Sequence, residues 1–464
     1  MTRVHAFTDD ALGDHDAVGL AGELRRGAVS VAEVRAAVAA RAAAVEPTLR
    51  GIQVDRLADP VTGAADGPLA GVPTFVKDNT DVQGWPTGNG SAAYVPRPAP
   101  AHAPVTRQIL ATGLDALGKS RMPEFGLNAS TEFTGAEPTV NPWDPRYSCG
   151  ASSGGAAALV AAGVVPIAHA NDGGGSIRIP AAACGLVGLK PGRGRMAPNA
   201  NGARMPINLV TDGVVSRSVR DTAVFLAAAD RHRRDPGHPP LGLVEGPAAR
   251  RLRIGIVLDS PTGATVDADT RATVEDTARA LEKLGHEVEP TTIAIDRRFV
   301  TDFVDYWSML AATIALGGRF AFGTTFQVAG LDPFTRGLIA RYKRVAPRTP
   351  AFLRRLARVR YDYAALFTRH DVLLSPVLAH VTPELGWLSP TVPFDQLLRR
   401  LTDYVAFTPL NNVAGAPAMS LPVGTSTGGL PIGVHLSVAH GDERTLLELA
   451  YALEAERPWR RIQD

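Results

Sequence analysis

The sequence predicts an α/β fold in which strands and helices alternate along most of the chain. Short apolar runs end at Gly, Pro or charged residues, and capped helical segments separate them. Apolar residues make up 45% of the 464 residues and charged residues 20%, which suits a globular protein with a large core. The net charge of +2 gives no overall attraction to nucleic acid or to an anionic membrane.

The N-terminal half begins with helical sequence and then introduces buried strands. A helix is expected over 30–47, because Ser30 and Glu33 have the spacing of a capping box. A short buried strand follows over 72–76 and stops at Lys77. The later patterns predict a helix, a strand and a loop over 107–126, a helix from near Ser152, a strand over 164–170 and a helix over 217–230.

The C-terminal half continues in the same style after a Pro- and Gly-rich stretch. We interpret this stretch, 231–247, as a surface loop, because a strand (251–260) and a helix (267–290) follow it. Strand-like runs are expected over 407–438 and a closing helix over 442–459. The sequence therefore predicts a single domain over residues 1–464.

The segment 299–363 is helical and unusually aromatic. Its aromatic residues include Phe303, Tyr306, Trp307, Phe320, Phe322, Phe326 and Phe334. Two hypotheses remain open: a lid or wall of a substrate pocket, and ordinary helical packing. The arginine-rich part, 341–360, is interrupted by Pro347 and Pro350, so we expect a solvated face there instead of a membrane or nucleic-acid surface.

Several classes of protein are excluded by missing patterns. The longest apolar run, 154–168, is shorter than the roughly 20 residues of a membrane span. The N-terminus turns acidic at once and has no apolar core, which argues against a secretory signal and favours a cytoplasmic protein. The eleven histidines form no HExxH or HxH motif, and the glycine clusters fit neither a phosphate loop nor a dinucleotide fingerprint. We expect no metal and no cofactor.

Two glycine clusters, "ASSGG" and "NDGGGSIR", carry the candidate chemistry. Successive glycine N–H groups can form an anion-binding cavity, and the Ser176 hydroxyl stands at the end of the second cluster. A plain glycine-rich turn is the alternative. Ser152 and Ser153 open a helix, and Lys77 follows an apolar strand whose burial would favour a neutral amine. His169 lies in the preceding strand, so we expect a packed residue there and a lysine base acting through a hydroxyl.

Three blocks of sequence resemble the amidase signature family. They are "GVPTFVKDN", "GASSGGAAALVAAGVVPIAHANDGGGSIRIPAAACGLVGLKP" and "GAPAMSLPVG…GLPIGVHL". The resemblance covers nearly the whole chain and is strongest to actinobacterial amidases and to the cyclic amide hydrolases of nylon-oligomer degradation. It implies a mixed central β-sheet covered by helices on both faces, with a signature core at about 65–220.

The resemblance also implies a role for each motif residue. The family's Ser–cis-Ser–Lys triad falls on Ser176, Ser152 and Lys77. The oxyanion hole falls on the backbone amides of Gly173, Gly174, Gly175 and Ser176. Asp172 and Arg178 resemble the residues that brace this loop by hydrogen bonds. Two positions depart from the family pattern: Gly173, where threonine or isoleucine is more common, and Ala151, where glycine is more common.

The predicted function is hydrolysis of a small carboxylic acid amide to a carboxylate and an amine or ammonia, through an acyl-enzyme on Ser176. Alternatives are a glutamine amidotransferase subunit acting on misacylated tRNA, a cyclic-amide or urea-type hydrolase, and a non-catalytic binding scaffold. Ile179 argues against the tRNA-linked subunit, which typically has glutamine there. Cys149 and Cys184 flank the motif, and we expect both to be inert packing residues.

The expected partner is a small-molecule amide, with neither nucleic acid nor a membrane involved. The oligomeric state is left open, with a homodimer as one candidate. The identity of the amide depends on loops that the sequence does not place, including 121–140 and the segment 299–363.

Overall fold

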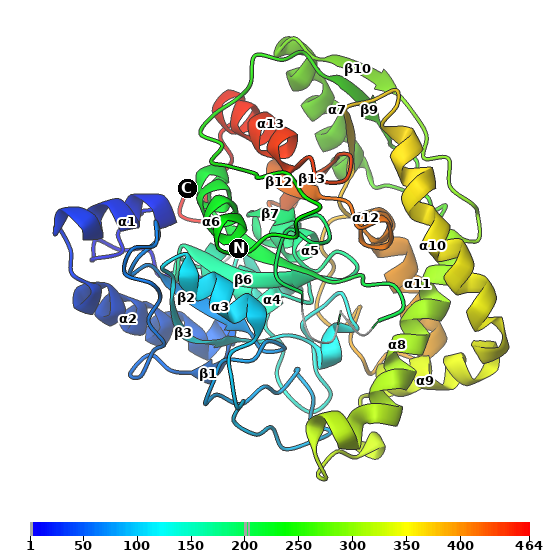
Figure 1. Ribbon diagram of the computed structural model, residues 1–464, viewed down its shortest axis with the longest axis horizontal. Coiled ribbons are helices and arrows are strands. Elements are labelled where there is room, and N and C mark those ends of the chain that lie inside the picture. Colours follow the sequence, from blue (N-terminus) through cyan, green and yellow to red (C-terminus); the bar gives the residue numbers. More distant parts are fainter. Residues whose placement is uncertain (1–2, 199–201, 203–204) are drawn as a thin grey trace.

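The computed structural model describes residues 3–198, 202 and 205–464, and a mixed eight-stranded sheet forms its centre (Figure 1). The strands are β6 (Ile167–Asp172), β7 (Val187–Lys190), β8 (Thr211–Ser216), β9 (Arg253–Ile256), β10 (Glu287–Pro290), β11 (Val372–Pro376), β12 (Ala418–Thr425) and β13 (Pro431–Ser437). Their order is β10-β9-β11-β13-β12-β7-β8-β6. β9 pairs in parallel with β10 and β11, and the other neighbours are antiparallel. The predicted α/β class with a mixed sheet is confirmed.

A smaller sheet continues the structure beyond β6. It has the order β1-β3-β2, formed by β1 (Ile52–Asp55), β3 (Asp115–Ser120) and β2 (Pro73–Lys77). Thr74 Oγ1 donates to the Ile167 carbonyl at 3.1 Å, so β2 lies directly beside β6. All five residues of β2 are buried, which confirms the predicted strand and brings its last residue into the interior. β4 (Val140–Asn141) and β5 (Asp144–Ser148) form a separate hairpin.

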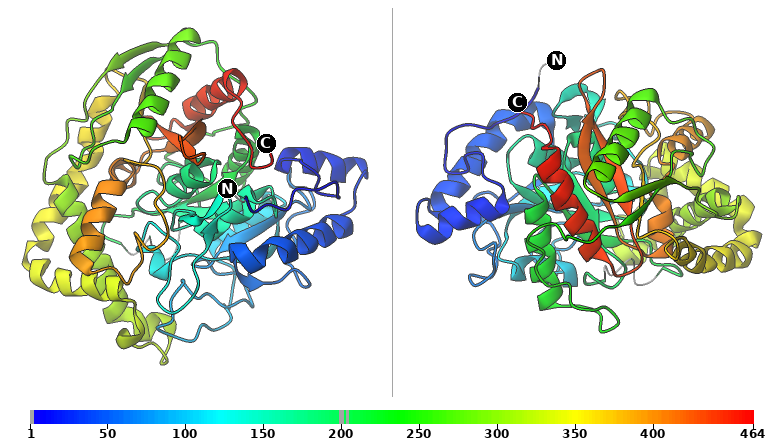
Figure 2. Two further views of the ribbon diagram at one scale, coloured as in Figure 1. Left: turned by 180° about the vertical axis from the view of Figure 1, so that it is seen from behind. Right: turned by 90° about the horizontal axis from the view of Figure 1, so that it is seen from above.

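Helices cover both faces of the large sheet, as expected (Figure 2). Two short helices made of small residues, α4 (Gly154–Ala161) and α5 (Arg178–Cys184), pack on one face and are buried along their whole length. The other face is covered by α6 (Val219–His232), α7 (Ala268–Lys283) and α13 (Glu443–Glu456). Gly155 shows why small residues are needed in α4, since a Cβ there would lie 2.5 Å from the Arg121 backbone nitrogen.

The helices of the N-terminal region lie at one side of the molecule, beside the smaller sheet (Figure 1). They are α1 (Ala17–Arg26) and α2 (Val31–Leu49), whereas α3 (Pro104–Ala111) lies nearer the middle and packs against α6. The capping box of α2 is present, with Ser30 Oγ accepting from the Glu33 N–H at 3.2 Å. α2 continues past Pro47 to Leu49, and the Arg50 N–H closes its last turn by donating to the Glu46 carbonyl at 3.1 Å.

A helical layer formed from 299–366 and 394–414 lies at the opposite side (Figure 1). Its helices are α8 (Phe299–Phe322), α9 (Pro333–Val345), α10 (Thr349–Leu366), α11 (Phe394–Tyr404) and α12 (Pro409–Ala414). Short 3-10 turns are η1 (Glu124–Gly126), η3 (Val328–Gly330) and η4 (Ala346–Arg348). Arg341 and Arg355 form ion pairs with Asp305 and Asp302 of α8, so part of the basic segment holds this layer together.

Within the described residues, α8 is the one helix long and apolar enough, by length and composition, to cross a membrane. Its best 18-residue window has a mean hydropathy of 1.2, and half of that window is buried inside the protein. Its buried Phe299, Tyr306, Met309 and Leu310 belong to an apolar cluster shared with α10 and α12.

Candidate active site

Lys77 is wholly buried at the end of β2. Its Nζ lies 2.7 Å from Ser152 Oγ and 2.7 Å from Asn171 Oδ1. Burial lowers the pKa of Lys77 to about 7, against the opposing negative charges of Asp212 and Asp172. A large part of this lysine is therefore neutral near pH 7, and a neutral amine at hydrogen-bonding distance can accept the proton of the Ser152 hydroxyl.

His169 packs under this lysine, as the sequence predicted. Its Nδ1 accepts the backbone N–H of Lys77 at 3.1 Å, and its Nε2 lies 3.1 Å from Asp212 Oδ1. Because Nδ1 accepts a hydrogen bond, the ring proton sits on Nε2 and points to Asp212. The imidazole therefore fixes the main chain at Lys77 and is not directed toward either serine hydroxyl.

The two serines of the motif reach the site from different elements. The Ala151–Ser152 peptide bond is cis, and Ser152 lies two residues before α4. Ser176 lies between β6 and α5 on the wall of a cavity. In the part of the chain that the structure describes, no hydrogen bond joins Ser152 to Ser176. Such bonds between catalytic groups commonly tighten only when substrate binds.

The glycine loop offers fewer unpaired N–H groups than the sequence suggested. The Gly175 N–H donates to Asp172 Oδ1 at 2.7 Å, so it is already engaged. Its φ of 133° favours glycine, and a Cβ added there would overlap Thr408 Oγ1. Among the described residues, the N–H groups of Gly173, Gly174 and Ser176 have no hydrogen-bond acceptor. Three of the four predicted amides thus remain able to bind an oxyanion.

Asp172 and Arg178 come together as a buried pair that braces this loop. Arg178 Nε and Nη2 each lie 2.9 Å from a carboxylate oxygen of Asp172, and neither side chain reaches solvent. Burial alone would raise the pKa of Asp172, but the charge and hydrogen bonds of Arg178 outweigh it and hold this pKa well below its ordinary value. The carboxylate therefore stays charged and keeps its hydrogen bonds to the backbone of Gly175 and Ile177.

Three residues that support this pair and the lysine were not predicted from the sequence. Asn412 Nδ2 donates to Asp172 Oδ1 at 2.8 Å, while its Oδ1 accepts from Arg178 Nη2 at 2.7 Å. His435 Nε2 accepts from Arg178 Nη1 at 2.9 Å, and burial and the Arg178 charge hold the pKa of His435 well below its ordinary value. Asn171, which contacts the lysine amine, is the third. The polar doublet "NN" inside the apolar "FTPLNNVAGAP" was the available signal for Asn412.

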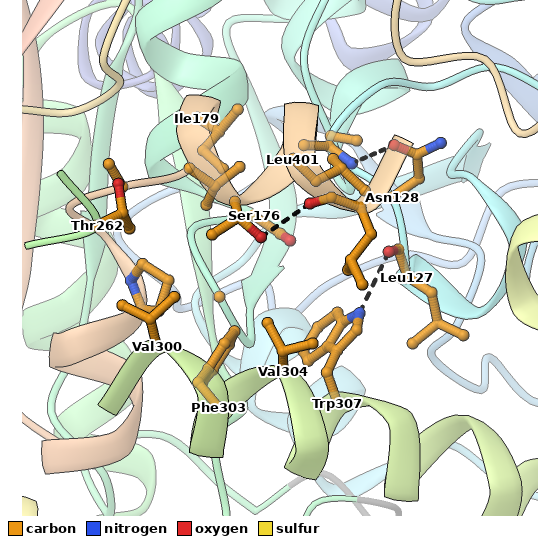
Figure 3. Close-up of a pocket in the computed structure, with 18 of the residues that line it drawn as sticks. Leu127, Asn128, Ser176, Ile179, Thr262, Val300, Phe303, Val304, Trp307 and Leu401 are labelled. Carbon is orange, nitrogen blue, oxygen red and sulfur yellow. Dashed lines mark hydrogen bonds between the residues drawn. The ribbon is translucent and has the colours of Figure 1, made fainter. Parts of the chain in front are cut away.

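A cavity of about 800 Å³, including its open mouth, lies in front of Ser176 (Figure 3). The walls come from the η1 loop, α8 and α11, with further residues from several loops. The lining residues include Leu127, Asn128, Ala129, Gly174, Ile179, Thr262, Phe299, Val300, Phe303, Val304, Trp307, Phe334, Leu398, Leu401, Thr402, Val405 and Pro409. A concave, mostly apolar lining with a few polar groups is typical of a small-molecule site.

The aromatic segment therefore serves both of the predicted purposes. Phe303 and Trp307 line the cavity, so the prediction that this segment forms a pocket wall is confirmed. Movement of the segment as a lid stays a prediction. Tyr306 is buried and donates to the Ile207 carbonyl, and Phe322 stacks on Tyr94 at 4.8 Å between centroids. Tyr306 and Phe322 therefore contribute to ordinary helical packing.

Cys149 and Cys184 are both buried and reduced. Burial raises the pKa of Cys149 to about 12 and that of Cys184 well above its ordinary value. Neither thiol lines the cavity. Among the described residues, no group of three or more His, Cys, Asp or Glu side chains is arranged to hold a metal ion.

Comparison with known proteins gives a consistent set of relatives. The Amidase family model matches residues 34–447. The chain is 48% identical over 467 residues to a Mycobacterium leprae protein named "Putative amidase AmiC", covering 100% of this chain and 99% of that protein. It is 34% identical over 485 residues to the 6-aminohexanoate-cyclic-dimer hydrolase of Pseudomonas sp., covering 96% and 95%. A solved 6-aminohexanoate cyclic dimer hydrolase superposes with a TM-score of 0.86 at 30% identity, over 98% of this chain and 99% of that one.

Proposed function

The chain belongs to the amidase family and hydrolyses amides, and we propose that it does so through an acyl-enzyme on Ser176, with Ser152 and Lys77 as the proton relay. The observation that carries the proposal is the wholly buried Lys77, whose Nζ lies 2.7 Å from Ser152 Oγ behind the cavity that holds Ser176. A lysine in this state is a base near neutral pH without any histidine.

The first half of the reaction forms the acyl-enzyme. Neutral Lys77 accepts the proton of Ser152, and Ser152 accepts the proton of Ser176 as Ser176 Oγ attacks the amide carbonyl carbon. Negative charge develops on the carbonyl oxygen, and the N–H groups of Gly173, Gly174 and Ser176 stabilise it. The C–N bond then breaks as the proton returns through Ser152 to the nitrogen, which leaves as amine or ammonia.

The second half releases the acid. Water gives a proton to the same relay and attacks the acyl carbon. The ester bond to Ser176 then breaks as the relay returns the proton to Ser176 Oγ, and the acid leaves and ionises to the carboxylate in solvent. Asp172 and Arg178 act indirectly throughout, because they hold Gly175 and with it the direction of the neighbouring N–H groups. Mutation of either should therefore disturb the oxyanion hole without removing a reacting atom.

The experiment is replacement of Ser176 by alanine, with Ser130→Ala as a matched buried serine outside the cavity. We expect Ser176→Ala to lose at least about a thousandfold in kcat, as nucleophile removal does in other serine hydrolases, while Ser130→Ala keeps its turnover. A fluorophosphonate should attach to the peptide that contains Ser176. Attachment to Ser153, or turnover near the unmutated rate in Ser176→Ala, would rule out the assignment.

A further inference from the structure

We infer that the substrate is an uncharged amide carrying a planar apolar group, which packs against the aromatic rings of Phe303 and Trp307 of α8. This inference rests on the proposed function, because it takes the carbonyl carbon to lie beside Ser176. It names a substrate class that the reaction alone leaves open.

The cavity wall carries no charge. None of the described residues that line it is Asp, Glu, Lys, Arg or His. Moving an ammonium or carboxylate group from water into such a site without a partner is strongly unfavourable. The site therefore discriminates against free amino-acid amides and against amides with a charged tail.

The polar side chains of the wall are already hydrogen-bonded to the protein. Asn128 Nδ2 donates to the Leu388 carbonyl at 2.8 Å, and its Oδ1 accepts from the Ala129 N–H at 2.7 Å. Thr402 Oγ1 donates to the Leu398 carbonyl at 2.8 Å. Trp307 Nε1 donates to the Leu127 carbonyl at 3.3 Å (Figure 3).

Thr262 Oγ1, the remaining wall hydroxyl, lies 2.7 Å from Ser260 Oγ. The polar groups left to meet a substrate are consequently few: the Ser176 hydroxyl, the loop amides and the second N–H of Asn128 Nδ2. A substrate that matches this site needs one polar group, the amide, and an apolar remainder.

The α8 wall presents a row of aromatic rings that stack on one another. Phe299, Phe303 and Trp307 recur every four residues, so their rings follow one face of the helix. The Phe303 and Trp307 rings are 5.6 Å apart between centroids and inclined by only 25°. Figure 3 shows both side chains directed from α8 toward Ser176. An aromatic group that meets these rings in an offset-stacked or edge-to-face arrangement gains more than an alkyl group of equal area.

These rings also lie close to Gly174 of the proposed oxyanion loop. A methyl group added to Gly174 would lie 3.5 Å from Phe303 Cζ and 3.9 Å from Trp307 Cη2. The aromatic rings therefore begin one van der Waals contact away from the proposed oxyanion loop. A ring bonded directly to the carbonyl carbon or to the amide nitrogen can touch these rings while the carbonyl oxygen reaches the loop.

The test measures kcat/KM on matched amides. Benzamide is compared with cyclohexanecarboxamide, and acetanilide with N-cyclohexylacetamide, so that the aryl group is placed on the acyl side or on the amine side. The cationic 6-aminohexanamide is the charged member. We expect at least one aryl amide to exceed its cyclohexyl partner by about two- to tenfold, and to exceed the cationic amide by at least about a hundredfold.

Substitutions in the cavity wall test whether its residues cause these substrate preferences. Phe303→Leu should remove most of the aryl-over-cyclohexyl advantage, whereas Phe320→Leu, a matched change at an exposed phenylalanine of the same helix, should preserve it. Leu401→Glu should raise turnover of the cationic amide relative to benzamide by at least about tenfold, because it supplies the missing partner charge.

The inference is wrong if neither aryl amide is preferred, if the cationic amide is turned over as well as they are, or if Phe303→Leu lowers aryl and cyclohexyl turnover equally. Each assay is repeated with Ser176→Ala. Turnover that survives this change contradicts the proposed mechanism, whereas Ser176-dependent turnover with the wrong preference contradicts only the substrate class.

Discussion

The two sides of the active site are built from opposite kinds of interaction. The floor consists of buried polar groups, Lys77, Asn171, Asp172, Arg178 and Asn412, and hydrogen bonds join each of them to another member. The wall opposite, from α8 and α11, is apolar, and its few polar side chains are bonded to the protein. Hydrogen bonds fix direction and apolar contacts do not, so we expect the floor to determine the rate on every amide and the wall to determine which amide is preferred.

The buried polar groups of the floor should also contribute much of the local stability. Removing one of their charges is expected to give the largest change in the free energy of unfolding. Arg178→Leu leaves Asp172 charged, buried and without its partner, which typically costs about 3–5 kcal/mol of unfolding free energy. Arg358→Leu, at an exposed arginine of α10, should change it by less than about 0.5 kcal/mol. The measurement is the free energy of unfolding in urea. Equal effects of the two variants would show that the buried pair is not important for stability.

Within the floor, two glycines of the same loop should respond differently. Gly175→Ala should lower kcat by about 10²–10³, as loss of one oxyanion donor does, because a side chain at φ 133° must displace Thr408 and reorient the loop. Gly173→Ala should cost far less, since its Cβ would approach only Val210 Cγ2, at 3.2 Å. Steady-state kinetics on one amide suffice, and a reversed order would contradict this description of the oxyanion hole.

A substitution in the wall should change the order of substrate preference without abolishing hydrolysis. Leu401→Ala removes apolar contact from the α11 side of the cavity and should lower kcat/KM for large apolar amides by about tenfold. Turnover of acetamide, whose single methyl group offers little apolar surface for Leu401 to contact, should change by less than about twofold. If both substrates lost the same factor, the division between floor and wall would be wrong.

The smallest effect is expected at the cysteines, which belong to neither side. Replacing both Cys149 and Cys184 with alanine should leave most of the turnover, because the thiols are buried away from the cavity and their raised pKa values keep them protonated. Activity and thermal unfolding are measured together. A folded double variant without activity would show that a thiol takes part.

The proposed reacting groups could be located from sequence because they lie in short local patterns, and the family resemblance supplied their roles. Lys77 ends a five-residue buried strand, and Ser176 follows three glycines, so each was visible in its own stretch of sequence. The supporting network could not be predicted in this way. Arg178 meets His435 across 257 residues, and Asn412 meets Asp172 across 240, and such contacts depend on how β6, α12 and β13 come together.

The same limit applies to the glycine loop. Three consecutive glycines look alike in sequence, and only the fold shows that the second is open toward the α8 rings while the third donates to Asp172. Phe299, Phe303 and Trp307 did have helical spacing, but which face of that helix met the cavity depended on its packing against α9 and α10.

The central claim is that neutral Lys77 moves the proton, and a matched amide and ester with the same acyl group test it most directly. The pKa of about 7 means that Lys77 gains a proton as the pH falls below 7 and can then no longer accept one from Ser152. Amide kcat/KM should therefore decline on the acid side of about pH 7.

Lys77→Ala should abolish this decline and lower amide turnover by about 10²–10⁴. Its ester turnover should fall by a smaller factor, because an alkoxide or phenoxide leaves with less help from a proton than an amine does. The decisive measurement is kcat/KM for both substrates across pH in the unmutated enzyme and in Lys77→Ala. Equal losses on amide and ester, or an unchanged acid limb in the variant, would show that Lys77 is not the base.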